Sequence, residues 1–443
     1  MRRILGLAWP LLVAQFVSIG MMVADTLIVG HFSTAHLAAV AVASGIYVTL
    51  ALALGGVLQA LAPIVGHHCG AGRIGAIGAD VRQGLWLTLF LAGLGILPLG
   101  LFPRELLAPA RLEPEVEEIA VSYLRLMAFA LPANLGYRAF YAVAAALGHP
   151  RPLMYVSCAE TLTHALLAWC LVGGHLPGLA PLGAPGAALS QALVNLGSFV
   201  CCGVLLARLP CFRPFGIFSR WEKPARSAQK ELLRLGVPTG FSYLVEISAF
   251  TLTALFIARL GAEAVGGHRI TANISALAYM LPLSLAIATA TQVAQAAGAG
   301  RERLAWAFAR AGLVTACVAS VVMALFWFQF REAISRLATE DPQVAAVAAA
   351  LIFYIAIYQI FDAIQTVACF SLRAYKISFL PLLIHMGAFW GLGLGFGYWL
   401  AFHAPVPQGV AGFWQAAVAA TLLAALLLGG LLLWVVRKRL ASR

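Results

Sequence analysis

The sequence predicts an all-α polytopic membrane protein with twelve transmembrane helices in two six-helix bundles. Three observations carry this prediction: the composition, the length of the apolar segments and an internal repeat. Hydrophobic residues make up 62% of the 443 residues, whereas Asp, Glu, Lys and Arg together make up only 10%. Soluble domains are about half apolar and about a quarter charged, so this chain has too few charges to cover a water-facing surface. A soluble enzyme, a disulfide-rich secreted scaffold and a disordered chain are excluded.

Twelve apolar segments are each long enough to cross a bilayer, which takes about 20 predominantly apolar residues. The first is too long for a cleaved signal peptide and lacks a small-residue cleavage site. Because the number of spans is even, both termini are expected on the same side of the membrane. In chain order the predicted spans are 5–30, 37–65, 84–103, 119–147, 153–174, 184–207, 232–259, 264–296, 305–329, 343–371, 378–402 and 409–436.

The basic residues predict which side that is. If both termini are cytoplasmic, the cytoplasmic segments hold 21 of the 29 Lys and Arg residues and the external loops hold five. Such a bias is typical of cytoplasmic loops. The net charge of +12 therefore follows membrane topology. The sequence has no aromatic-interleaved basic patch of the kind that binds nucleic acid, and no nucleic-acid partner is expected.

The longest polar stretch, 209–230, divides the chain almost in half. It contains three prolines and alternating basic and aromatic residues, which predicts a cytoplasmic linker lying against anionic lipid headgroups. We therefore expect an N-terminal six-helix bundle over 1–208 and a C-terminal six-helix bundle over 231–443.

An internal repeat relates the two halves. At an offset of 228 positions (238 minus 10), Pro10 aligns with Pro238 and Gly70–Arg73 aligns with Gly298–Arg301, both reading GAGR. Each proline could kink its helix or be one of the prolines that membrane helices commonly contain. Both halves hold six spans and start on the same side, which predicts a pseudo-two-fold axis along the membrane normal. Parallel repeats of this kind are typical of secondary transporters.

Acidic side chains inside the predicted spans are the main candidates for function, because charge at membrane depth is costly and rarely kept without a role. A carboxylate there can take up a proton, or bind Na⁺ where other oxygens surround it. Tyr358 precedes Asp362 by one helical turn, so its phenol shares a face with that carboxylate. The four acidic residues are Asp25, Glu160, Glu246 and Asp362.

Some of these residues have a second interpretation. Asp25 could cap the outer end of its helix, although a helix C-terminus disfavours a carboxylate. Glu160 has His164 one turn later, a pair that could be a structural ion pair or a proton relay. Two arginines of the fourth span could pair with nearby acidic residues or line a cavity, and another at the start of the eighth could extend to the interface. These arginines are Arg125, Arg138 and Arg269.

Enzyme signatures are missing from the sequence. It has no Walker P-loop, GxSxG or HExxH motif, so no enzyme, ATP-driven pump or bound cofactor is expected. His67, His68 and Cys69 resemble a metal cluster but lack a fourth ligand, which favours a structural role.

Taken together, these motifs resemble those of the multidrug and toxic compound extrusion (MATE) family, in particular its bacterial NorM-like branch. The resemblance covers nearly the whole chain. The residues on which the resemblance rests are Pro10 with Ala24–Thr26, Leu58–Arg73, Gly236–Pro238 with Glu246, His268–Asn273, and Ile357–Lys376.

The resemblance implies export of bulky, amphipathic and often cationic compounds across the bacterial inner membrane, by antiport with H⁺ or Na⁺. It implies a cation site at Glu246, Tyr358 and Asp362, where Na⁺ could bind. The expected partners are these small lipophilic or cationic substrates and membrane lipids, and the chain is expected to be a monomer with both termini cytoplasmic.

The resemblance also places an essential carboxylate at Asp25, with the Ser190 hydroxyl near it. His164 stands where the family often has an asparagine, which weakens the case for Na⁺ and favours a proton site. Glu160 is a further candidate for this N-terminal site. The alternative function is a flippase for lipid-linked precursors or polysaccharides, which should have a markedly basic cavity. An ion channel is disfavoured because the carboxylates do not form a ring.

Overall fold

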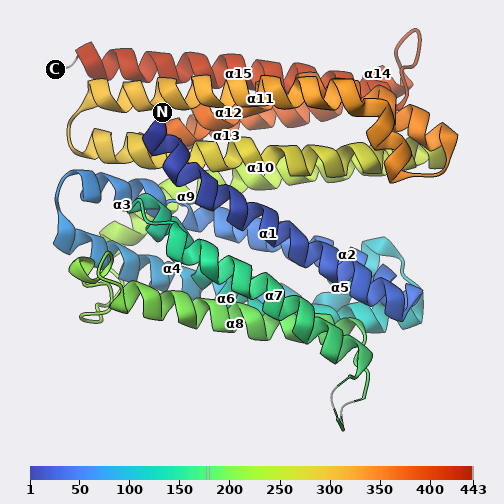
Figure 1. Cartoon of the computed structure of the whole chain (residues 1–443), viewed down its shortest axis with the longest axis horizontal. Coiled ribbons are helices and arrows are strands. Elements are labelled where there is room, and N and C mark those ends of the chain that lie inside the picture. The colour runs from blue at the N-terminus through green and yellow to red at the C-terminus, as the bar shows by residue number, and fades with distance from the viewer. Residues whose placement is uncertain (176, 179, 442–443) are drawn as a thin grey trace. The chain divides into compact units, whose positions relative to one another are not determined.

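The computed structural model describes residues 1–175, 177–178 and 180–441 (Figure 1). Within these residues the secondary structure is helical, and twelve segments are long and apolar enough to cross a membrane, which confirms the predicted fold class. They are α1 (Arg2–Phe32), α2 with α3 (Thr34–Gly70), α4 (Ile74–Leu101), α6 (Pro114–Ala146), α7 (Arg151–Gly173), α8 (Ala184–Arg208), α9 with η3 (Arg226–Leu260), α10 (Ala262–Gly298), α11 (Glu302–Ala338), α12 (Pro342–Ala374), α13 to α14 (Phe379–Phe402) and α15 (Val410–Ala441).

The second span is broken, although its hydropathy is continuous. The α2 helix (Thr34–Leu58) ends and α3 (Leu61–Gly70) begins two residues later. Pro63 explains the break, because proline has no N–H and its ring collides with the carbonyl four residues earlier, here that of Gln59. The intervening residues form tighter bonds, from Gln59 N to Gly56 O and from Ala60 N to Val57 O. In contrast, α1 and α9 continue through Pro10 and Pro238.

The eleventh span changes helix type. After α13 (Phe379–His385) the chain forms a π-helix, η4 (Met386–Phe396), before α14 (Gly397–Phe402). At the start of α14, Gly397 allows close packing on α15, because a Cβ there would lie only 3.1 Å from the Ala416 Cβ.

The helices form two compact units. One contains Pro10–Gly240, and the other contains Met1–Trp9 with Phe241–Arg443. Each unit is built around one central helix. In the first unit α6 packs against α2, α4 and α8, and in the second α12 packs against α10, α11 and α15. These central helices are the fourth span of each half, as an internal repeat requires.

The linker is attached to α4 by a buried arginine. Arg82 donates hydrogen bonds to the carbonyl oxygens of Gly216 (3.0 Å) and Ile217 (3.1 Å) and pairs with Glu222 at 2.7 Å. The Trp86 Nε1 also donates to the Glu222 carbonyl oxygen at 2.8 Å. These contacts hold the linker to protein, and its position against lipid headgroups stays a prediction.

Candidate functional site

The C-terminal candidates come from two helices of one unit. Glu246 lies on α9, and Tyr358 and Asp362 lie on the buried face of α12. The three side chains interact electrostatically with one another. The structure therefore brings together the three residues that the sequence selected, although their cation-binding role stays a prediction.

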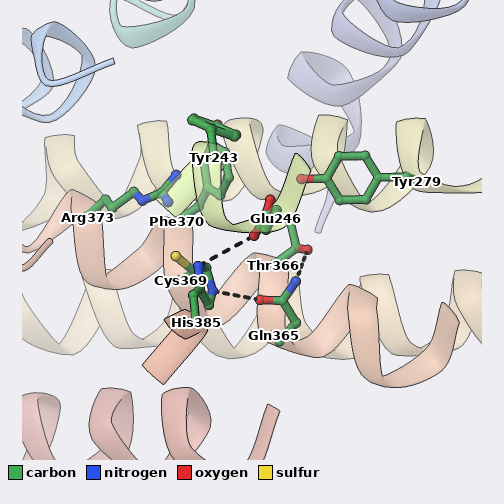
Figure 2. A pocket seen from close by; sticks show the side chains of 9 residues that line it. All are labelled: Tyr243, Glu246, Tyr279, Gln365, Thr366, Cys369, Phe370, Arg373 and His385. Atoms are coloured by element: carbon green, nitrogen blue, oxygen red, sulfur yellow. Dashed lines mark hydrogen bonds and ion pairs between the residues drawn. The ribbon is translucent and has the colours of Figure 1, made fainter. Parts of the chain in front are cut away.

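Two further residues, which the sequence analysis did not select, connect the carboxylates. The Gln365 Nε2 donates to the Asp362 Oδ1 at 3.0 Å, and the Gln365 Oε1 lies 3.1 Å from the His385 Nε2. On the other side of the ring, the His385 Nδ1 lies 3.5 Å from the Glu246 Oε1. Figure 2 shows this chain of side chains from Glu246 through the imidazole to the amide. A lone polar residue at membrane depth was the available signal for His385 and Gln365.

A small cavity of about 10 Å³ lies beside these groups, close to the minimum volume that holds one water molecule. Its lining combines charged, polar and aromatic side chains from α9, α10, α12 and α13 (Figure 2). The lining residues are Tyr243, Glu246, Tyr279, Gln365, Thr366, Cys369, Phe370, Arg373 and His385.

Arg373 also lines this cavity, although its position near a span end made it appear to be a cytoplasmic charge. It is only 8% exposed, and its guanidinium lies 5.3 Å from the Tyr243 ring centroid and 5.0 Å from that of Phe370. Its Nε and Nη1 have no hydrogen-bond partner among the described residues. An arginine stays protonated in proteins. It therefore places a permanent positive charge in the cavity that Glu246 lines.

The N-terminal candidates meet across three helices of the other unit. The His164 Nε2 on α7 lies 2.8 Å from the Asp25 Oδ1 on α1, and the His164 Nδ1 lies 3.0 Å from the Ser190 Oγ on α8. The Ser190 Oγ is also 3.2 Å from the His164 carbonyl oxygen. All three residues are buried. The carboxylate, the imidazole and the hydroxyl therefore form one continuous hydrogen-bonded group.

Glu160 has other partners. Both ring nitrogens of His164 are taken by Asp25 and Ser190, so the one-turn spacing from Glu160 to His164 does not produce an ion pair. Glu160 instead interacts with the Ser198 hydroxyl and with the charge of Arg138.

Of the three arginines whose role the sequence left open, one is half-buried and two are exposed. The Arg138 Nε donates to the Asn134 Oδ1 at 3.0 Å, while Arg125 and Arg269 are exposed. At the end of the second span, His68 pairs with Asp80 of α4 at 2.5 Å.

Comparison with known proteins identifies the family. The family model MatE matches residues 10–170 and 238–399, so its two matches begin at the repeat-related Pro10 and Pro238. Over 98% of its length the chain is 50% identical to a probable multidrug resistance protein NorM of Aromatoleum aromaticum, of which it covers 94%. It is 32% identical to the multidrug resistance protein PmpM of Pseudomonas aeruginosa, over 97% of this chain and 90% of that one.

A solved structure has the same fold. The Vibrio cholerae MATE transporter VcmN in its bent form matches with a TM-score of 0.88 at 16% identity, covering 99% of this chain and 97% of that one. With the family model and the relatives, this likeness confirms the resemblance seen in the sequence. The chain therefore belongs to the MatE family, the multidrug and toxic compound extrusion transporters.

Proposed function

We propose that this protein exports amphipathic, often cationic compounds across the bacterial inner membrane, by antiport with H⁺ or Na⁺. Its relatives carry the names of multidrug resistance proteins, which supports this substrate class. The proposal includes cytoplasmic termini, a monomeric state and transport without a cofactor or any covalent reaction. Its partners are the exported compounds and membrane lipids.

The charge balance of Glu246, Asp362, Arg373 and His385, the Glu246 cluster, is the observation that carries the proposal. When Glu246 and Asp362 are ionised and His385 is neutral, the carboxylates contribute two negative charges and Arg373 contributes one positive charge. One net negative charge is left in a buried environment, where electrostatic interactions are strong. A single monovalent cation, H⁺ or Na⁺, neutralises it.

This balance supplies a mechanism for exchange. With the coupling ion absent, the net negative charge attracts a lipophilic cation. With the ion bound, that attraction is lost and the substrate is released. Because the two cations are stabilised by the same charge, each weakens binding of the other, and the weakening is reciprocal. Asp25 of the other unit contributes a second negative charge of this kind.

The flippase alternative requires a predominantly basic cavity. Here two carboxylates outnumber Arg373, and the N-terminal group contains a carboxylate with no arginine. This charge balance favours cationic substrates over lipid-linked phosphates.

The test is efflux of a fluorescent lipophilic cation from proteoliposomes, with pH and Na⁺ gradients imposed separately. We expect efflux under at least one inward cation gradient and none without a gradient. Asp362→Asn should abolish gradient-driven efflux while the protein stays folded in the membrane. Equal dye movement with and without gradients, or near-normal efflux by that variant, would refute the proposal.

A further inference from the structure

The buried group on α1, α7 and α8 has hydrogen-bonding properties that identify its ligand. An imidazole has one N–H when neutral and two when protonated. Asp25 as a carboxylate only accepts hydrogen bonds, so the His164 Nε2 must carry a proton and donate to the Asp25 Oδ1 at 2.8 Å. The other ring nitrogen, Nδ1, is therefore the atom that gains or loses a proton.

Ser190 can satisfy Nδ1 in either state. With His164 neutral, the Ser190 hydroxyl donates to the Nδ1 lone pair across 3.0 Å. With His164 protonated, Nδ1–H donates to the Ser190 Oγ, and the hydroxyl hydrogen turns to the His164 carbonyl oxygen at 3.2 Å. Only one hydrogen atom rotates between the two arrangements. No buried polar atom of the group loses its partner in either state, which avoids the usual cost of an unsatisfied group.

Sodium does not fit the same atoms. Hard cations are bound by several oxygens, whereas an imidazole suits softer metals. The Asp25 carboxylate and the Ser190 hydroxyl bond to opposite nitrogens of one ring, so the imidazole separates the two oxygen ligands. An ion that contacts both would have to displace His164, which is completely buried.

We propose that Asp25, His164 and Ser190 form a binding site for H⁺ that excludes Na⁺, with His164 carrying the proton. The site then changes from one net negative charge to a neutral ion pair, and Asp25 stays ionised throughout. This inference rests on the proposed antiport and assigns H⁺ as the coupling ion of this unit. Ser190 is a positioning residue, because it acts through the imidazole.

Other ionisable groups surround this site. Tyr123 of α6 interacts electrostatically with Asp25. Glu160 lies one turn before His164 on α7, and Arg138 of α6 acts on it. The α8 helix contributes Ser190, which does not titrate. These groups lie around the site, but the hydrogen-bonding atoms named above hold the proton.

The test follows the charge state of His164 directly, by solid-state NMR of the full-length protein with isotope-labelled histidine in liposomes. His164→Gln assigns the resonance. We expect His164 to become protonated at Nδ1 as the pH falls, with a midpoint that does not depend on Na⁺. A hydrogen bond to a charged group is roughly twice as strong as a neutral one. Ser190→Ala should therefore lower the proton affinity about tenfold, or about one pH unit.

Ser198→Ala is the matched control. Ser198 is also buried on α8 but interacts with Glu160, so this variant should leave the His164 midpoint unchanged. A His164 that stays neutral while dye efflux proceeds, or a midpoint that moves with Na⁺, would overturn the proposal. If the wild-type protein exports no dye under any gradient but His164 titrates as described, the antiport fails and the proton site stands. Asp25→Asn, which should also lower the affinity, provides a second variant if Ser190→Ala does not fold.

Discussion

Two glutamines on α12 should differ strongly in how the same substitution changes the stability of the protein. Gln365 and Gln359 are both 2% exposed. Gln365 bonds to Asp362 at 3.0 Å, to the Thr366 Oγ1 at 3.1 Å and to His385 at 3.1 Å. Gln359 donates only to the Met323 sulfur at 3.3 Å, and its Oε1 has no hydrogen-bond partner among the described residues. Leucine has a similar volume to glutamine, so the variants differ mainly in lost hydrogen bonds.

The magnitudes follow from the groups left behind. Gln365→Leu leaves the Asp362 carboxylate and the His385 Nε2 buried without these partners, at about 1–3 kcal/mol each, or about 3 kcal/mol in total. Gln359→Leu removes an unsatisfied oxygen and should change stability by less than about 1 kcal/mol, or raise it. Heat unfolding in detergent can be followed by the additional reaction of the buried Cys202 and Cys369 thiols with a fluorogenic reagent. Equal destabilisation by both variants would refute the hydrogen-bond reasoning.

Three further predictions follow from other contacts. A Cβ on Gly236 would lie 2.2 Å from the Val57 carbonyl oxygen, so Gly236→Ala should destabilise the protein by about 1–3 kcal/mol in the same unfolding assay; Gly75→Ala, with open space around it, should not. The hydrogen bond from Arg82 holds the pKa of Glu222 below its usual 4.5, so the ion pair between the two side chains should be complete above that pH and lost as the pH falls through the lowered value. Fluorescence of Trp221, whose ring centroid is 5.4 Å from that of Trp86, should report this loss, and Glu222→Gln should remove the transition. Arg373→Gln removes the positive charge of the Glu246 cluster, so two monovalent cations are needed to neutralise the two carboxylates. The Hill coefficient for cation-dependent dye release should therefore rise. An unchanged coefficient would contradict the charge balance.

Hydropathy predicted the twelve spans because the bilayer sets both their length and their composition. The proline and GAGR matches predicted the repeat, and the central positions of α6 and α12 agree with it. Hydropathy did not predict where the backbone hydrogen-bonding pattern changes within a span. The break at Pro63 and the π-helix of Met386–Phe396 lie within continuous apolar sequence, where hydropathy does not change.

The candidate carboxylates were predictable because intramembrane charge is rare, but their partners were not. Spacing along one helix suggested that His164 would pair with Glu160, whereas the rotation of α1 and α7 places Asp25 at its ring. Counting charges near span ends treated Arg82 and Arg373 as solvated, although both are buried and held by tertiary contacts. Such pairings depend on how neighbouring helices are rotated, which a hydropathy profile does not contain.

Equilibrium binding of a fluorescent lipophilic cation to the purified protein tests the central claim most directly. If coupling ions and substrate are stabilised by the same negative charges, added H⁺ or Na⁺ should weaken binding of the cation, with little effect on an uncharged analogue. Asp362→Asn should weaken binding of the cation and reduce its dependence on the added ions. Binding that is independent of both pH and Na⁺ would contradict the account.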